Sequence, residues 1–105
     1  MENYITIYVG QDDEGNDTLI LEQIIGGKSF EIEETGFLNL LSEGDFILEL
    51  GNLLNTASIF VRELGLRLRV DVDEIQDEIW ELDLSEDCVT NSRLLIKEVL
   101  EQKRS

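Results

Sequence analysis

The sequence predicts a single α+β domain in which an antiparallel sheet of about five strands packs against two or three helices. Its 105 residues suit one domain built around one core. Three short segments in the first third alternate apolar and polar residues, which is typical of strands. Later segments repeat apolar residues every three or four positions, which is typical of helices. We therefore expect residues 1–105 to form one unit with the order β-β-β-α-β-β-α.

The first third of the chain predicts a three-stranded antiparallel meander. Residues Asn3–Val9 and Thr18–Ile25 are rich in β-branched, aromatic and leucine side chains, and the turn-rich segment Gly10–Asp17 separates them. Gly26-Gly27 provides a second tight turn, because paired glycines adopt positive φ readily. Ser29–Glu33 then alternates again and supplies the third strand.

The first strand divides its side chains between two faces. Ile5 and Ile7 lie on one face, and Tyr4 and Tyr8 lie on the other. A sheet that is covered on both sides would bury the tyrosines, whereas a sheet with one bare face would leave them exposed.

Two helices are expected in the middle of the chain. Thr35 is placed to cap a short helix that contains Phe37–Leu41. The longer helix has Asp45 as a plausible N-cap and an apolar stripe, and Gly65 is placed to end it in a left-handed conformation. Gly51 lies inside this helix, where glycine costs about 1 kcal/mol relative to alanine.

The strand expected next alternates without error over Leu66–Val72. Beyond it, Ile79–Leu84 alternates as well, and we favour a return strand that pairs with Leu66–Val72. The alternative is a helix, because Ile75, Ile79 and Leu82 are spaced by four and three residues.

A last helix is expected to close the chain. Ser85 or Asn91 can serve as its N-cap, and its apolar residues Leu94, Leu95 and Val99 would pack on the sheet. Lys103-Arg104 would suit the negative end of the helix dipole.

The charge of the chain narrows the choice of partners. With 24 acidic and 8 basic residues, the net charge is −16 at pH 7. This charge disfavours direct binding to nucleic acid or to an anionic membrane, and it favours encounter with a basic protein surface. The single cysteine, Cys88, and an N-terminus without the features of a signal peptide predict a cytoplasmic protein.

Several kinds of chemistry lack the residues they need. The chain has no histidine, which excludes Ser-His and Cys-His catalysis within it. The acidic loop at Gly10–Asp17 fails the EF-hand spacing, since Leu21 stands where the bidentate Glu should be. Neither a Walker loop nor a GxGxxG motif is present. We expect no enzyme, no cofactor and no metal site.

The strongest candidate for a binding site is the stretch from Asp71 to Asp87, which has nine carboxylates and no Lys or Arg. Carboxylates spaced along one surface can imitate the phosphates that a nucleic-acid-binding protein recognises. An aromatic residue among them could anchor the complex. The residues expected to bind the partner are Asp71, Asp73, Asp77, Glu78, Trp80, Glu81 and Asp83.

The sequence thus predicts a non-enzymatic protein that binds, and thereby inhibits, a basic nucleic-acid-binding partner. An anti-defence factor, an immunity protein or an antitoxin would act in this way. The main alternative is a structural or adaptor subunit, or a homodimer, that docks through apolar surface while the acidic residues provide solubility. A divalent-metal-binding domain that uses the same carboxylates is a third hypothesis.

Overall fold

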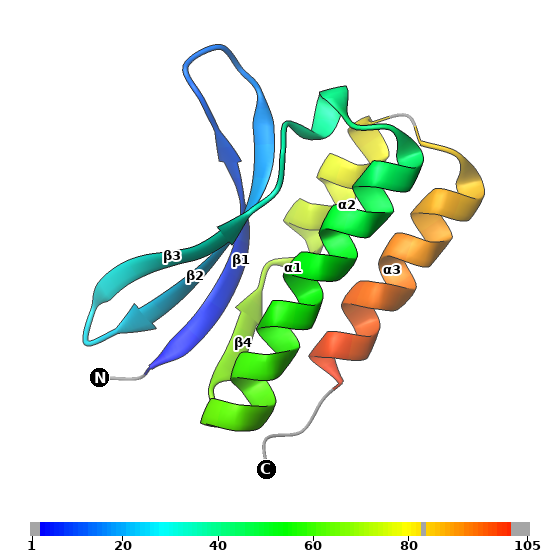
Figure 1. Ribbon diagram of the computed structural model, residues 1–105. Helices are drawn as coiled ribbons and strands as arrows, with labels where there is room; N and C mark the ends of the chain where they lie inside the picture. Colours follow the sequence, from blue (N-terminus) through cyan, green and yellow to red (C-terminus); the bar gives the residue numbers. More distant parts are fainter. Residues whose placement is uncertain (1–2, 83, 102–105) are drawn as a thin grey trace.

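The computed structural model describes residues 3–82 and 84–101 and contains one four-stranded sheet covered by helices (Figure 1). In chain order the elements are β1 (Tyr4–Gln11), β2 (Asp17–Ile25), β3 (Lys28–Glu34), the 3-10 turn η1 (Leu38–Leu40), α1 (Glu43–Leu64), β4 (Arg67–Val70), α2 (Val72–Glu81) and α3 (Glu86–Leu100). The strand order across the sheet is β3-β2-β1-β4. The α+β class and the single compact domain agree with the sequence prediction.

The first three strands form the predicted antiparallel meander. Tyr4 pairs with Ile24 at one end of the β1–β2 ladder, and Gln11 pairs with Asp17 at the other. Gly26 and Gly27 connect β2 to β3 with φ angles of 58° and 82°, which side chains with a Cβ adopt rarely.

The fourth strand corrects the prediction of a purely antiparallel sheet with about five strands. β4 lies beside β1 and runs parallel to it, so the sheet in the described part of the chain is mixed and has four strands. The reason is the path of α1, which carries the chain from β3 at one edge of the sheet to β4 at the other. A parallel neighbour needs a crossover of this kind, and alternation along one strand does not reveal it.

The segment that we expected to form a fifth strand, Ile79–Leu84, begins in a helix, because α2 extends to Glu81. Ile79 belongs to α2, where it and Ile75 are almost completely buried. The helical spacing of these two residues therefore prevails over the alternation of Trp80, Leu82 and Leu84. Trp80, which the sequence nominated as a partner-binding residue, is 71% exposed.

The short helix after β3 also differs from the prediction. It is a single 3-10 turn that begins after Phe37, and Thr35 does not cap it. The Thr35 hydroxyl instead accepts a hydrogen bond from Leu19 N at 2.9 Å and donates to Gly36 O at 3.0 Å. Thr35 is buried, and it fastens the end of β3 to β2.

The long helix α1 begins earlier than predicted and ends where expected. Ser42 rather than Asp45 is the N-cap, because the Ser42 hydroxyl accepts a hydrogen bond from Asp45 N at 3.2 Å. Gly65 adopts φ 64° at the C-terminal end and confirms the predicted left-handed stop.

Ser85, one of the two predicted caps, begins α3, and Asn91 lies inside that helix. The Ser85 hydroxyl accepts a hydrogen bond from Cys88 N and donates one to Glu43 Oε2 at 2.7 Å. Ser85 N donates a further hydrogen bond to Glu43 Oε1 at 2.9 Å. Glu43 thus joins the first turns of α1 and α3. The predicted basic end at Lys103-Arg104 lies outside the described residues.

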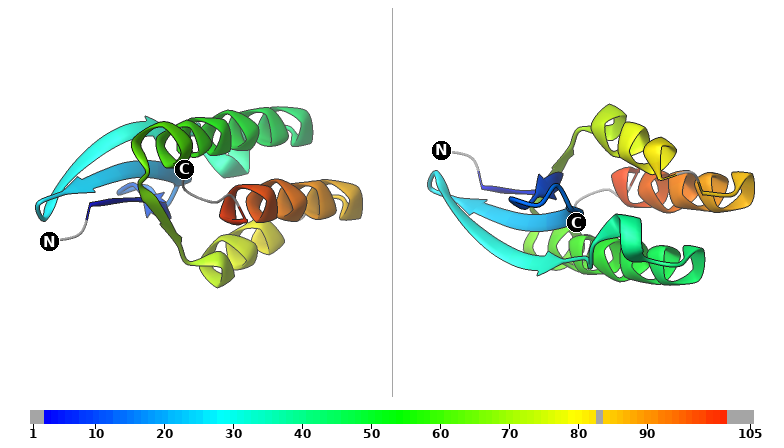
Figure 2. Two further views of the ribbon diagram at one scale, coloured as in Figure 1. Left: turned by 90° about the horizontal axis from the view of Figure 1, so that it is seen from below. Right: turned by 90° about the horizontal axis from the view of Figure 1, so that it is seen from above.

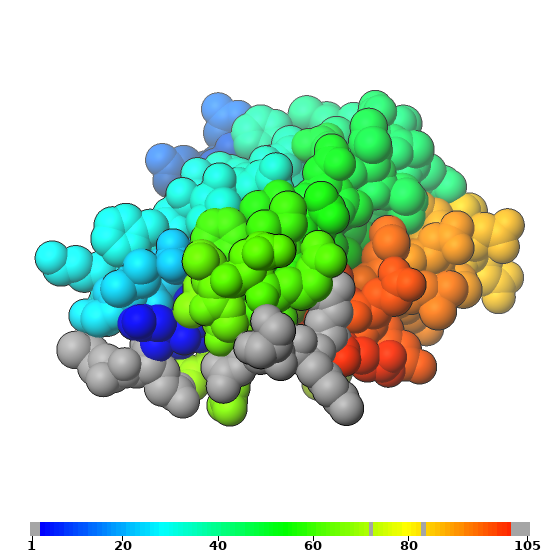
Figure 3. All heavy atoms as spheres, turned by 60° about the horizontal axis from the view of Figure 1, so that its bottom comes forward, coloured from blue at the N-terminus to red at the C-terminus, as the bar shows by residue number. Residues whose placement is uncertain are grey.

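All three helices lie on one side of the sheet, and no helix in the described part of the chain covers the opposite side (Figure 2). α1 packs on β2 and β4, α2 packs on β1, and α3 packs mainly on α1. In Figure 3, α1 (green) lies between the β2–β3 hairpin (cyan) and α3 (orange). The core between sheet and helices includes Ile5, Ile7, Leu19, Leu21, Phe46, Leu50, Leu53 and Ala57.

Gly51, inside α1, and Gly65, its C-cap, give matched tests of the geometry of this helix. A Cβ added at Gly51 or at Gly65 meets no atom within 4 Å, so only the backbone conformation distinguishes the two sites. Gly51→Ala should raise the free energy of unfolding by about 1 kcal/mol. Gly65→Ala should lower it by roughly 1–2 kcal/mol, because φ is positive there. Urea unfolding measures both, and stabilisation by Gly65→Ala would contradict the left-handed stop.

Candidate functional site

Because residues 72–81 are helical, the carboxylates of the acidic stretch divide among different sides of α2. Glu74, Glu78 and Glu81 follow one another at intervals of four and three residues and share one side, which faces the β1–β2 hairpin. The expected return strand, Ile79–Leu84, would instead have left Asp77 and Glu78 in the connection before it, apart from Glu81. The helix therefore determines which carboxylates meet.

These carboxylates line a groove of about 390 Å³ between α2 and the hairpin. We call it the acidic groove. Of the described residues that line it, five are acidic, two are neutral and none is basic: Asp17, Glu74, Asp77, Glu78, Glu81, Val9 and Gln11. Asp17 comes from the start of β2, so segments about 60 residues apart in the sequence contribute to one surface.

The position of α2 over β1 depends on the short length of β4. The β1–β4 pairing ends with Ile7 and Val70, and the chain then turns directly into α2. Val9 N, two residues farther along β1, donates a hydrogen bond to Glu74 Oε1 at 3.3 Å. A side chain of α2 thus accepts a hydrogen bond from the backbone of β1, just beyond the point where the pairing with β4 ends.

Glu78 is the most buried of the residues that line the acidic groove and is only 8% exposed. Its burial, its hydrogen bond to Asp17 and the negative charges of Asp17, Glu81 and Glu74 together raise the pKa of its carboxyl group to about 7, from an ordinary value of 4.5. Below this pKa the protonated Glu78 carboxyl donates a hydrogen bond to Asp17, and above it the ionised Glu78 is repelled by the neighbouring carboxylates.

The structure brings together three of the seven residues that the sequence nominated. Asp77, Glu78 and Glu81 lie in the acidic groove. Asp71 instead caps α2, since its Oδ1 accepts a hydrogen bond from Glu74 N at 3.1 Å. Asp73 is exposed in the first turn of the helix. Asp83 lies outside the described residues.

Two of the five carboxylates of the groove, Asp17 and Glu74, were absent from the sequence-based prediction. Glu74 could have been found from the helical alternative, which places it four residues before Glu78 on the same side. For Asp17 the sequence holds no comparable signal, because its contact with α2 depends on how the hairpin lies against the helix.

Trp80 borders a different groove, on the α3 side of α2. This groove has a volume of about 570 Å³ and is lined by Trp80, Leu84, Glu86, Val89, Thr90 and Arg93. Trp80 is 71% exposed, which is a large apolar area for a solvent-facing position. α2 therefore presents carboxylates toward the hairpin and an indole ring toward α3.

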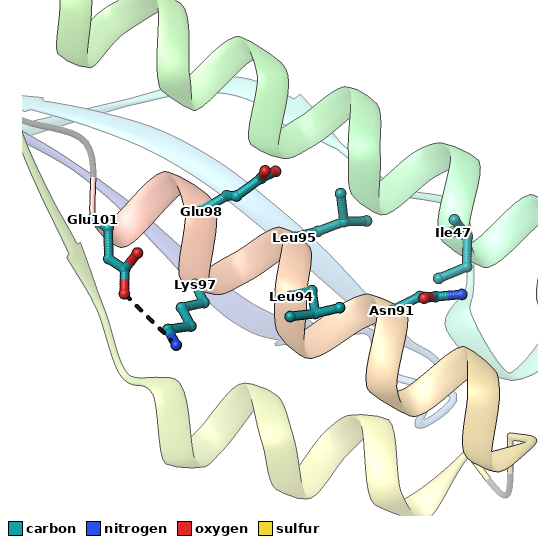
Figure 4. A pocket seen from close by; sticks show the side chains of 7 residues that line it. All are labelled: Ile47, Asn91, Leu94, Leu95, Lys97, Glu98 and Glu101. Carbon is teal, nitrogen blue, oxygen red and sulfur yellow. Dashed lines mark ion pairs between the residues drawn. The ribbon is translucent and has the colours of Figure 1, made fainter.

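A third groove, of about 550 Å³, follows α3 where it faces α1 (Figure 4). Leu95 points toward α1, and Ile47 of α1 lies at the end of the groove. Leu94 is 56% exposed. Lys97 Nζ and Glu101 Oε1 lie 3.8 Å apart along α3 (Figure 4). This groove is the most apolar of the three and differs in character from the acidic groove.

The acidic turn between β1 and β2 has a structural role of its own. Asp12 Oδ1 accepts hydrogen bonds from Asn16 N at 2.8 Å and from Glu14 N at 3.0 Å. These hydrogen bonds lower the pKa of the Asp12 carboxyl group. The turn is thus closed by its own aspartate, which is consistent with the absence of EF-hand spacing.

The remaining reactive group is the buried thiol of Cys88. Burial raises its pKa, and the charge of Glu43 raises it further, so the thiol form predominates at neutral pH. Within residues 3–82 and 84–101, no three carboxylate or thiol side chains are arranged to hold a metal ion. None of the helices in the described part of the chain combines the length and apolar character needed to cross a bilayer.

Comparisons of the chain with models of known protein families, with curated proteins and with solved structures found no match.

The raised pKa of Glu78 predicts how stability depends on pH. Between about pH 4.5 and 7 the folded protein keeps a proton on Glu78 that the unfolded chain releases. The contribution of Glu78 to stability therefore decreases as the pH rises through this window, and it stays low above it. Glu78→Gln should raise the free energy of unfolding at pH 8 by on the order of 1–2 kcal/mol, because the amide can donate to Asp17 without adding charge.

Urea unfolding at pH 5, 6, 7 and 8 measures this effect as the difference between wild type and Glu78→Gln. The control is Glu98→Gln, which neutralises an exposed carboxylate of α3. Equal effects of Glu78→Gln at pH 5 and pH 8 would contradict the raised pKa of the buried Glu78 carboxyl group.

Proposed function

We propose that this protein is a non-enzymatic binding protein whose acidic groove engages the basic surface of a protein partner. The observation that carries the proposal is the convergence of five carboxylates, from α2 and from the β1–β2 hairpin, in a groove with no basic residue among the described residues that line it. An arrangement of this kind costs folding energy by charge repulsion. A cationic side chain from a partner would relieve that cost.

Arginine and lysine side chains are the groups that fit this groove chemically. A guanidinium group can bridge two carboxylates with paired, charge-assisted hydrogen bonds. Glu78 and Asp17 at the base of the groove lie close enough to share a hydrogen bond. A partner cation placed between them would offset the negative charge that raises the pKa of Glu78.

In its most concrete form the proposal names a nucleic-acid-binding protein as the partner. Such a protein carries lysines and arginines arranged to meet phosphates, and their first interaction with any ligand is electrostatic. An acidic surface that occupies them would compete with nucleic acid and inhibit the partner. The net charge of −16 would also accelerate the encounter. An anti-defence, immunity or antitoxin role fits this mode of action.

Trp80 would serve as the apolar anchor of the complex. It lies on α2, the helix that supplies four of the five carboxylates, but on the side that faces α3. A partner that straddled α2 would contact the acidic groove and the indole ring together. Burial of an exposed tryptophan is a common source of binding energy at the centre of an interface.

A matched pair of variants tests the proposal in a tagged pull-down from the source cells. The site variant combines Asp17→Asn, Asp77→Asn and Glu81→Gln. The control variant combines Glu63→Gln, Glu98→Gln and Glu101→Gln. It also removes three negative charges, but from exposed positions on α1 and near the end of α3. Asp71 is left unchanged because it caps α2.

We expect wild type and control to retain a basic nucleic-acid-binding protein and the site variant to lose it. Retention should fall steeply between about 50 and 200 mM salt, and added nucleic acid should compete. Equal loss of the partner from the site variant and the control would show that net charge alone determines whether the partner is retained. That result would contradict a role for the groove.

The exposed apolar side chains favour a second candidate function, that of an adaptor subunit. Leu94 and Trp80, both more than half exposed, border the grooves on either side of α3. A partner that docks there would bind through burial of apolar surface, and its retention would change little with salt. In the same pull-down, a partner that survives 200 mM salt and the site variant but is lost on Leu94→Asp would favour the adaptor.

A further inference from the structure

The side of the sheet that none of the described helices covers, which we call the open sheet face, presents a continuous surface of side chains. Register places Tyr4, Thr6 and Tyr8 of β1 on this face, beside Ile24, Glu22 and Ile20 of β2. All six residues are only partly buried. The helices lie on the other side of the sheet and do not cover them (Figure 2). Gly10 extends the surface, since a Cβ there would meet Ile20 Cδ1.

Charge is distributed unevenly across the open sheet face. One row of paired residues runs from Glu31 on β3 through Glu22 and Thr6 to Arg69 on β4. The next row runs from Ser29 through Ile24 and Tyr4 to Arg67. The β3 side of the face is therefore acidic, the β4 side is basic, and tyrosine and isoleucine side chains occupy the middle.

Contacts within the face support this arrangement. The guanidinium carbon of Arg69 lies 4.2 Å from the centre of the Tyr4 ring, so the cation lies over the aromatic middle of the sheet. Burial raises the pKa of the Tyr8 hydroxyl, and the carboxylates of Glu22, Glu31 and Glu34 raise it further. The tyrosines thus lie between the glutamates of β2 and β3 on one side and the arginines of β4 on the other.

The edges of the sheet are poorly suited to symmetric pairing between copies. The free edge at β3 carries Glu31, Glu33 and Glu34, and the free edge at β4 carries Arg67 and Arg69. Two β3 edges, or two β4 edges, would bring like charges together. Pairing of β3 with the β4 edge of another copy would bring opposite charges together. However, such head-to-tail pairing leaves one β3 edge and one β4 edge free in every dimer, so it would produce open chains of copies.

We propose that the open sheet face is a homodimer interface in which two sheets stack with a two-fold axis parallel to their strands. This axis places the basic β4 side of each copy over the acidic β2–β3 side of the other. Arg67 and Arg69 then face Glu22 and Glu31, and the tyrosines and isoleucines meet in the middle. A two-fold axis perpendicular to the strands would instead place arginine over arginine. Charge therefore selects one of the two face-to-face arrangements.

In this dimer the apolar middle supplies most of the affinity and the flanking charges fix the orientation. Aromatic and aliphatic side chains dominate the energy of most interfaces, whereas exposed ion pairs contribute little individually. The acidic groove lies on the helical side of each copy and stays accessible. The dimer would therefore present two acidic grooves that point away from each other.

Sedimentation of two charge-reversed variants tests the proposed arrangement. The first variant is Arg67→Glu with Arg69→Glu, and the second is Glu22→Lys with Glu31→Lys. Each variant alone faces like charges in both halves of the interface, so we expect its dimer to dissociate at least tenfold more readily than that of wild type. An equimolar mixture restores opposite charges in both halves, so heterodimers should form. Circular dichroism confirms that each variant is folded.

A second measurement on the unaltered protein keeps the test decisive if a variant fails to fold. In a mixed labelled and unlabelled sample, NMR should detect contacts between the Tyr8 ring of one copy and β2 side chains of the other. Wild type that stays monomeric at high concentration would overturn the proposal, as would a dimer without these contacts or one that neither variant weakens. Assemblies larger than dimers would indicate β3–β4 pairing instead.

Discussion

The path of α1 across the sheet is the constraint on which the rest of the structure depends. Phe46, Leu50, Leu53 and Ala57 lie in the core, each at most 1% exposed. Burial of each large apolar side chain contributes roughly 1.5–3 kcal/mol. By crossing from β3 to β4, α1 sets the parallel β1–β4 pairing, which in turn brings α2 over β1. It also provides the surface on which α3 packs. The acidic groove exists because α1 positions β4 and the helix that follows it.

Charge at the groove opposes the packing that creates it. Ile75 and Ile79 hold α2 against the core, while Glu78, between them, is brought close to Asp17 and away from water. The apolar contacts outweigh this local repulsion, and the raised pKa of Glu78 is its visible consequence. Proteins commonly accept such strain where a surface has to meet a ligand of opposite charge. This is the physical basis for assigning the groove a binding role.

Local patterns in the sequence predicted the elements better than their arrangement. Some features depend only on residues that are close together in the sequence, so the sequence predicts them directly. They are the alternation in β1 and β2, the glycine pair before β3 and the end of α1 at Gly65. The Ile79–Leu84 segment was assigned wrongly because six residues satisfy both periods. Burial of Ile75 and Ile79 decides for the helix, and burial is a property of the whole fold. The sequence did not predict that β4 pairs in parallel with β1, because this pairing also depends on the whole fold. Asp77, Glu78 and Glu81 were found from composition, whereas Asp17 required the tertiary structure.

The central claim is that the hairpin and α2 bring Asp17 and Glu78 together in one groove. A carbon-detected NMR titration of the side-chain carboxyl groups tests it most directly, because each glutamate is followed separately. The account predicts that Glu78 titrates near pH 7 and that Asp17→Asn moves its titration toward the ordinary value of 4.5. A wild-type Glu78 that titrates near 4.5, or one that Asp17→Asn leaves unchanged, would contradict the convergence and the function proposed from it.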